Sequence, residues 1–228
     1  MAIALVANTT ASSPTGGADP AVTSAIDTTG ATLLVIAVTN QTDAAATVTD
    51  NKGNTWTEIT PRRGTSHYTS IWYSYNDSGA ALTVGSGHTF SVTGGYVGIT
   101  VSAWSGTKTH TEDPKDQTNG ATAVGTTTSL NTGSITPSVN GCLVFSTLGQ
   151  YLLTNRSVNS PSTILNQLNG VSGKSYGTDD AYVIQTTAAS VSATYSYDST
   201  ANGNGALIAS FLPATVAANT TNFFQILN

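Results

Sequence analysis

A Gly-x-Ser-x-Gly pattern at Gly173-Lys174-Ser175-Tyr176-Gly177 matches the motif that carries the nucleophilic serine of many hydrolases. That chemistry requires a strand, a sharp turn and a helix, so that the serine hydroxyl stands exposed beside an oxyanion hole. The residues that follow, Thr178 to Val183, favour a turn and a strand instead. We therefore expect a loop here. A hydrolase that uses Ser175 with a distant histidine and aspartate remains an alternative, because triad residues can come from distant positions.

The three histidines, His67, His88 and His110, lie in polar stretches with no helical i, i+4 spacing and no neighbouring cysteine pair. Structural zinc sites use such spacings, so no zinc site is predicted. The single cysteine, Cys142, lies in an apolar segment that is typical of a buried strand, and one cysteine cannot form an internal disulfide framework. The sequence predicts no catalytic residue and no cofactor.

Acidic residues gather in the polar segment 107–120, which contains Glu112, Asp113 and Asp116. Oxygen-rich loops can bind Ca²⁺, but the spacing of an EF-hand is absent. We expect a solvated connection between the two halves of the chain, and calcium binding by Glu112 to Asp116 stays open. Asp179 and Asp180 are adjacent on an expected strand, so their carboxylates should point to opposite faces and share neither a proton nor a metal.

Aromatic residues offer a second kind of site. Amphipathic rings suit a surface that stacks against sugars, but aromatic side chains on strands also fill cores and strengthen cross-strand pairs. Tyr73 and Tyr75 share one strand face, and Tyr195 and Tyr197 share another. A glycan-stacking surface requires these pairs to face solvent, and its candidates are Trp72, Tyr73, Tyr75, Tyr195 and Tyr197.

The elements that must position these residues are strands. Residues 31–39 form a continuous apolar run, which predicts a central strand covered on both faces. Residues 46–50 and 55–59 flank Asn51-Lys52-Gly53-Asn54, which predicts a hairpin with Gly53 at positive φ. Residues 162–168 favour at most one short turn. Further strands are expected at 68–75, 81–84, 89–92, 96–104, 127–135, 142–148, 181–186, 191–197 and 206–212. No internal repeat is evident.

The composition of the chain argues against several classes of function. The net charge is -5 with only 7 Lys and Arg, too few for a surface that neutralises many phosphates, so no nucleic-acid partner is expected. No apolar run reaches the ~20 residues of a membrane helix, and the N-terminal residues lack the basic region of a signal peptide. Richness in Thr, Ser, Gly and Asn with only 8% charged residues is typical of proteins that work outside cells. Structural proteins of bacteriophage particles combine such a composition with the lack of a signal peptide, because they are made in the cytoplasm and released by lysis.

Four segments carry a resemblance to a known family: Asp50–Trp56, Ile71–Asn76, Val101–Gly106 and Ala206–Pro213. They resemble a β-sandwich module of tailed-phage virion proteins and of some bacterial surface proteins. The likeness spans about residues 30–213 and implies a sandwich fold without catalytic residues. Its glycine and asparagine serve a turn, and its aromatics serve a core.

We expect an all-β, antiparallel, jelly-roll-like sandwich in one domain (1–213), followed by a short C-terminal arm (214–228). The expected function is that of a non-enzymatic virion protein, a capsid decoration or cement protein that forms a homo-oligomer, with a trimer favoured. Its partners would be the major capsid protein or other virion proteins, and it would be synthesised in the host cytoplasm. The alternative is a tail-fibre, spike or surface carbohydrate-binding module. The expected assembly contacts are Ile3, Leu5, Val6, Phe223, Phe224, Ile226 and Leu227.

Overall fold

The computed structural model describes residues 2–13, 20–41, 45–64, 67–77, 81–109, 112–123, 127–151, 155–169, 176–201 and 204–214. These residues form an all-β protein in which antiparallel sheets pack against one another, as the sequence predicts. They contain no helix with the length and apolar character to cross a membrane.

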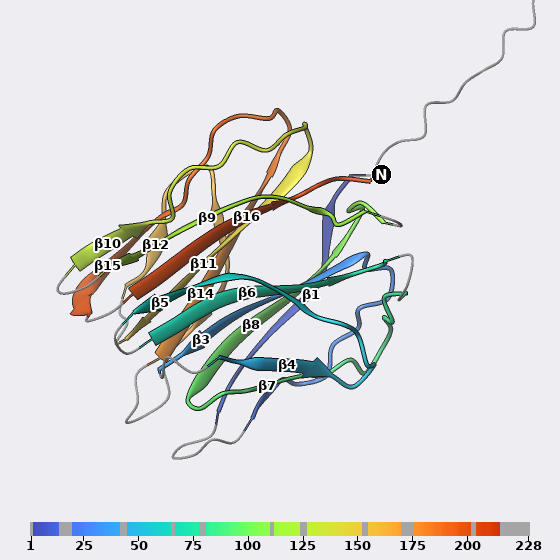
Figure 1. Cartoon of the computed structure of the whole chain (residues 1–228), viewed down its shortest axis with the longest axis horizontal. Helices are drawn as coiled ribbons and strands as arrows, with labels where there is room; N and C mark the ends of the chain where they lie inside the picture. Colours follow the sequence, from blue (N-terminus) through green and yellow to red (C-terminus); the bar gives the residue numbers. More distant parts are fainter. Residues whose placement is uncertain are drawn as a thin grey trace, which may run out of the picture.

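The first half of the chain forms a sandwich of a five-stranded and a three-stranded sheet (Figure 1). The large sheet has the order β1-β8-β3-β6-β5, and the small sheet has the order β2-β7-β4. The first strand thus pairs with the last, the third with the sixth and the second with the seventh, which is the nested pairing of a jelly roll. The strands are β1 (Ala4–Ser12), β2 (Ala21–Val22), β3 (Leu33–Asn40), β4 (Thr47–Asp50), β5 (Thr57–Gly64), β6 (His67–Tyr75), β7 (Phe90–Thr93) and β8 (Val97–Ser105).

The second half repeats this topology strand for strand. Its large sheet has the order β13-β14-β11-β16-β9 and its small sheet the order β10-β15-β12, so each strand of the first half corresponds to the strand numbered eight higher. The strands are β9 (Lys115–Ala123), β10 (Thr127–Asn131), β11 (Cys142–Tyr151), β12 (Ser157–Val158), β13 (Thr163–Leu168), β14 (Tyr176–Gln185), β15 (Thr194–Ala201) and β16 (Asn204–Phe211). Within the described residues, the two halves therefore share one eight-stranded topology, a repeat that the sequence did not predict.

A short polar anchor marks the duplication. The Thr23 hydroxyl accepts a hydrogen bond from the Phe90 amide, and Ile26 forms an isolated bridge with His88. In the second unit the Thr132 hydroxyl accepts from the Ala193 amide, and Ile135 bridges Val191. The Thr-x-x-Ile spacing before the third strand of each unit is the signal that could have revealed the repeat.

The two large sheets lie face to face between the two small sheets, giving four layers (Figure 1). Strand β1 lies against β13 and β5 against β9, while β8 contacts β14 and β6 contacts β16. Exchanging the two units leaves this pattern of contacts unchanged, since β5 corresponds to β13 and β9 to β1. The units are thus related by an approximate two-fold axis, the arrangement that symmetric homodimers use for a self-complementary interface.

The large sheets are buried on both faces. On β3, Leu33, Val35 and Ala37 face the second unit, and Leu34, Ile36 and Val38 face the first unit's own small sheet. This explains the continuous apolar run, because neither face of the strand meets water. We call the cluster between the two large sheets the shared core; its buried members are Ile3, Leu33, Val35, Ala37, Ile59, Ile71, Tyr73, Trp104, Leu143, Phe145, Leu207, Ala209 and Phe211.

Polar residues fill the remainder of the interface between the large sheets. Gly149 on β11 lies so close to β3 and β6 that an added Cβ would clash with Thr69 Oγ1 and Thr39 Oγ1. The Thr178 hydroxyl on β14 donates to the Gly98 carbonyl on β8 over 3.1 Å. Glycine opposite threonine allows the two backbones to approach more closely than two full side chains would.

Several local expectations were wrong. Residues 46–50 and 55–59 do not form a hairpin, because β4 pairs with β7 in the small sheet and β5 pairs with β6 in the large one. Gly53 does adopt the expected positive φ, 74°. Residues 81–84 are not a strand, whereas β13 is a strand where only a turn was expected. The segment 107–120, expected to be a loop, contains the start of β9.

Candidate functional site

The aromatic residues expected on a glycan-stacking surface lie mostly inside the protein. Tyr73 belongs to the shared core, and Tyr195 and Tyr197 lie between β15 and the second large sheet, each no more than 3% exposed. Their hydroxyls are engaged as well: Tyr195 pairs with Ser146 over 2.8 Å and Tyr197 with Thr127 over 2.7 Å. These three residues are therefore core residues rather than members of a stacking surface, since a buried ring presents no face to a sugar.

Trp72 and Tyr75 are the two candidates that keep partial exposure. The Trp72 indole N–H donates to the Ser70 hydroxyl over 2.9 Å, which holds the ring against its own strand. The Tyr75 ring stacks on Tyr73 with centroids 6.0 Å apart and an interplanar angle of 19°. They point to opposite faces of β6, so they do not form one platform.

Of the expected assembly contacts, two are buried or partly buried, one is exposed, and the others lie outside the described residues. Ile3 is 5% exposed in the shared core, and Val6 packs against the core of the first unit. These two residues stabilise the fold, so they are not free to contact another subunit through their side chains. Leu5, between them on the edge strand β1, is exposed. Phe223, Phe224, Ile226 and Leu227 lie outside the described residues.

Ser175, the serine of the possible hydrolase, also lies outside the described residues, as does His110. The structure instead brings together Asp50, His88 and Thr28, a constellation that the sequence analysis missed. His88 Nε2 lies 3.2 Å from Asp50 Oδ1, and His88 Nδ1 lies 2.9 Å from the Thr28 hydroxyl. The order carboxylate, imidazole, hydroxyl resembles a catalytic triad.

Burial argues against catalysis at this constellation. The side chains of Asp50 and His88 are fully buried, and so is Thr28. The Thr28 hydroxyl also bonds the Gly85 backbone, accepting from its N–H over 3.0 Å and donating to its carbonyl over 3.3 Å. A nucleophile needs access to substrate, so we interpret these residues as a structural tie between three chain segments.

Asp50 organises the turn that leads from β4 to β5. Its carboxylate accepts hydrogen bonds from the Lys52 amide over 2.8 Å, from the Asn54 side chain over 3.2 Å and from the Trp56 indole over 2.8 Å. Burial alone would raise the pKa of Asp50, but the contacts with His88, Trp56 and the turn amides outweigh burial and lower it. The carboxylate therefore stays ionised and holds the turn in one conformation.

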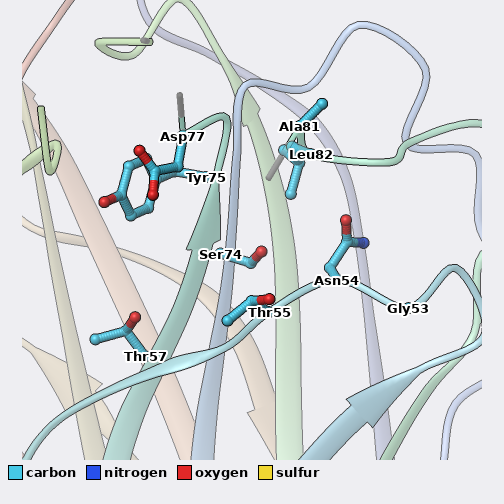
Figure 2. Close-up of a pocket in the computed structure, with 9 residues that line it drawn as sticks. All are labelled: Gly53, Asn54, Thr55, Thr57, Ser74, Tyr75, Asp77, Ala81 and Leu82. Carbon is cyan, nitrogen blue, oxygen red and sulfur yellow. The ribbon is translucent and has the colours of Figure 1, made fainter. Parts of the chain in front are cut away.

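A pocket of about 130 Å³ opens beside this turn (Figure 2). It is lined by Asn54 and Thr55 of the turn, by Thr57 of β5, by Ser74 and Tyr75 of β6, and by Gly53, Asp77, Ala81 and Leu82. In Figure 2, Tyr75 and Asp77 lie on one side and Asn54 on the other, with Ser74 and Thr55 between them. The lining is rich in hydroxyl groups and contains no Lys, Arg or His.

Asp179 and Asp180 are both buried on β14 and point to opposite faces of the strand, as their adjacency predicted: Asp180 faces Thr100 of the first unit, and Asp179 faces Arg156. Asp179 pairs with Arg156 Nε over 2.8 Å, and Asp180 accepts from the Asn166 amide over 3.1 Å. Burial raises the pKa of each carboxyl to about 7; Arg156 opposes this for Asp179, and Asn166 and Thr100 oppose it for Asp180. Because a guanidinium faces Asp179 and only neutral groups face Asp180, we infer that Asp180 holds its proton more tightly.

The acidic segment from Glu112 to Asp116 is used by the fold. Asp113 accepts from the Tyr73 hydroxyl over 2.7 Å, and Asp116 accepts from the Ser138 amide over 2.8 Å and the Ser210 hydroxyl over 3.1 Å. The described residues hold no group of three or more His, Cys, Asp or Glu side chains placed to bind a metal ion. The carboxylates of Asp113 and Asp116 thus anchor the connection between the two units.

The pocket beside Tyr75 is a candidate binding site formed by described residues. It was not predicted, because its walls come from segments that meet only through the fold. No protein-family model, curated protein or solved structure matches the chain. The function therefore has to be inferred from the fold and from the chemistry of its surfaces.

Proposed function

We propose that this chain is a non-enzymatic structural protein of a bacteriophage particle, acting on the capsid surface as a decoration or cement protein. The observation that carries the proposal is the four-layer body with one shared core, in which Asp50, His88 and Asp113 are all committed to holding the fold. Such a body is a rigid block suited to bearing load between neighbouring subunits. Its partners would be further copies of itself, the major capsid protein or other virion proteins.

The low charge supports this role. Charged residues make up 8% of the chain, so broad surfaces can be buried without desolvating many ions. Cores of subunit interfaces are likewise depleted of charged residues. The large hydrophobic side chains exposed on the described surface are Leu5, Val22 and Val139.

Leu5 is a specific candidate for a contact between subunits. It lies on β1, an edge strand of the first large sheet among the described residues, and edge strands are sites where another chain can pair. We propose that Leu5 and the apolar residues Phe223, Phe224, Ile226 and Leu227 contribute to contacts between subunits, with a trimer as the favoured oligomer.

Light scattering during size-exclusion chromatography tests this proposal. We would compare the full chain with a variant truncated after Pro213 and with Leu5→Ser. The expected result is a trimer that dissociates on truncation and is weakened by Leu5→Ser, while Thr122→Ser, a mild change on an exposed β9 residue, has no effect. A monomer that neither change affects would contradict assembly through these segments.

A second candidate function is that of a surface module that binds glycans. The exposed aromatic platform expected for it is not formed, but the hydroxyl-lined pocket beside Tyr75 favours sugar binding by a different geometry. A decoration protein can also carry such a pocket, so the two roles are compatible.

A further inference from the structure

We propose that the pocket between Asn54 and Tyr75 binds a single neutral pyranose, such as the terminal residue of a surface glycan. This inference rests on the glycan-binding role given above as the second candidate and names its ligand class; it does not rest on the structural role, because the pocket lies within one unit.

The pocket walls are preorganised. The Asn54 side chain donates to the Thr83 carbonyl over 2.9 Å and accepts from the Thr83 amide over 2.7 Å. This two-way bond joins the turn after β4 to the segment that carries Ala81 and Leu82. Two walls of the pocket are therefore fixed before any ligand arrives, which lowers the entropic cost of binding.

The buried carboxylate of Asp50 fixes the same turn from the other side. It bonds Lys52, Asn54 and Trp56, and the fully buried His88 lies against it. Burying a carboxylate and an imidazole is costly unless both are well paired. This buried polar network thus holds in place the turn that forms the pocket wall.

The third wall is rigid because of the tyrosine pair. Tyr75 stacks on Tyr73, and the Tyr73 hydroxyl donates to Asp113 over 2.7 Å. One face of the Tyr75 ring is thereby occupied by protein, while the residue itself keeps partial exposure at the pocket. An aromatic ring held in this way offers an apolar surface next to polar groups, which suits the C–H face of a sugar.

The charge of the lining selects the ligand class. Asp77 lines the pocket, and both Asp77 and Asp113 lie near enough to Tyr75 to raise its pKa in addition to the larger effect of burial. The described lining offers no cationic side chain to pair with an anion, and the Asp77 carboxylate would repel one. The described residues offer no cluster of ligands for a metal ion. Neutral polyols are the ligand class that fits this lining, because the side chains of the pocket can exchange hydrogen bonds with hydroxyl groups. These side chains are Thr55, Thr57, Ser74 and Asp77.

The size of the pocket limits the ligand to one ring. Its volume of about 130 Å³ compares with the roughly 150 Å³ cavity that holds one benzene molecule in an engineered core. The pocket therefore has room for no more than one six-membered ring.

The test is nuclear magnetic resonance titration of the ¹⁵N-labelled full chain with methyl glycosides of glucose, galactose, mannose and N-acetylglucosamine, and with anionic methyl glucuronide. We expect at least one neutral glycoside to shift the amide signals of Thr55, Thr57 and Asp77, and glucuronide to bind at least tenfold more weakly. Tyr75→Ala and the pocket-filling Ala81→Trp should each weaken binding by tenfold or more. Asp77→Asn should weaken it about threefold, whereas Asp198→Asn, an exposed carboxylate on the outer sheet of the second unit, should not change it.

Ala81 is exposed in a loop, so Ala81→Trp keeps the test interpretable if Tyr75→Ala fails to fold. Three results would overturn the proposal: no neutral glycoside shifts the pocket signals, Ala81→Trp binds as tightly as the unmodified chain, or glucuronide binds as well as the neutral sugars.

Discussion

Gly149 shows how one missing methyl group sets the distance between the two large sheets. Its position on β11 faces Thr69 and Thr39 of the other unit, with no space for a Cβ atom. The Gly149→Ala variant should lose about 1–3 kcal/mol of unfolding free energy, because overpacking forces backbone shifts. Urea unfolding followed by circular dichroism measures the loss. Gly30→Asn is the control, since Gly30 has open space around it and a φ of 84° that asparagine tolerates; equal losses in both variants would contradict the close approach.

The buried carboxyl of Asp180 predicts an unusual pH dependence. Its pKa is raised to about 7 in the folded protein, against about 3.9 in an unfolded chain. Between these values the folded form keeps a proton that the unfolded form releases. Stability should therefore fall as pH rises from about 4 to about 7, with a slope of up to about 1.4 kcal/mol per pH unit from this group.

Asp180→Asn isolates this effect, because the new amide oxygen can still accept from Asn166. Its stability at pH 8 should exceed that of the unmodified chain, and the fall between pH 5 and pH 8 should become shallower. Asp116→Asn is the matched control, since the hydrogen bonds of Asp116 outweigh burial and lower its pKa, so its contribution is lost only under acidic conditions. An unchanged slope in Asp180→Asn would contradict the assignment.

At the scale of elements, the turn between β4 and β5 depends on Asp50. Asp50→Ala should cost about 3–5 kcal/mol, because it leaves His88 and the Trp56 indole without their buried acceptor. Trp56→Phe removes one hydrogen bond to a charged group and should cost about 1.5–3 kcal/mol. Thermal unfolding followed by far-ultraviolet circular dichroism compares the two.

Asp27→Asn is the control for this pair of variants. Asp27 is an exposed carboxylate that caps its own turn through Thr29, and asparagine keeps an oxygen there. A change within about 0.5 kcal/mol is expected for a surface position. If Asp50→Ala were no more harmful than Asp27→Asn, the turn would not depend on the buried pair.

The sequence predicted the strands better than their pairing. The apolar run of β3 and the alternation of Ile71, Tyr73 and Tyr75 are local patterns, and both were confirmed. Pairing was harder, because β4 and β5 are neighbours in sequence but belong to different sheets, and no local residue type shows that the chain crosses between them.

The candidate site was harder still to predict. Asp50 and His88 lie 38 residues apart by their numbering and meet only because β4 pairs with β7. The pocket joins a turn, a strand end and a loop that Asn54 holds together. The aromatic strands were read correctly as strands, but which face meets water depends on a second unit that the sequence analysis did not recognise.

At the scale of the whole molecule, the approximate two-fold axis makes the two units interdependent. Residues from both supply the shared core, including Tyr73 of the first unit and Phe211 of the second, whose rings meet edge to face with centroids 5.5 Å apart. The rigid block proposed for particle assembly, and the tyrosine pair that forms the pocket wall, both depend on this core. We therefore expect the two units to unfold as one cooperative body.

Differential scanning calorimetry of the intact chain and of Phe211→Ala tests this claim most directly. The account predicts one transition whose calorimetric and van't Hoff enthalpies agree, shifted as a whole by a loss of about 3–5 kcal/mol in Phe211→Ala. Val22→Ala, at a side chain that is 54% exposed, should leave the transition in place. Two separate transitions, or a Phe211→Ala variant in which only part of the heat absorption moves, would show that the units unfold independently and would contradict the account.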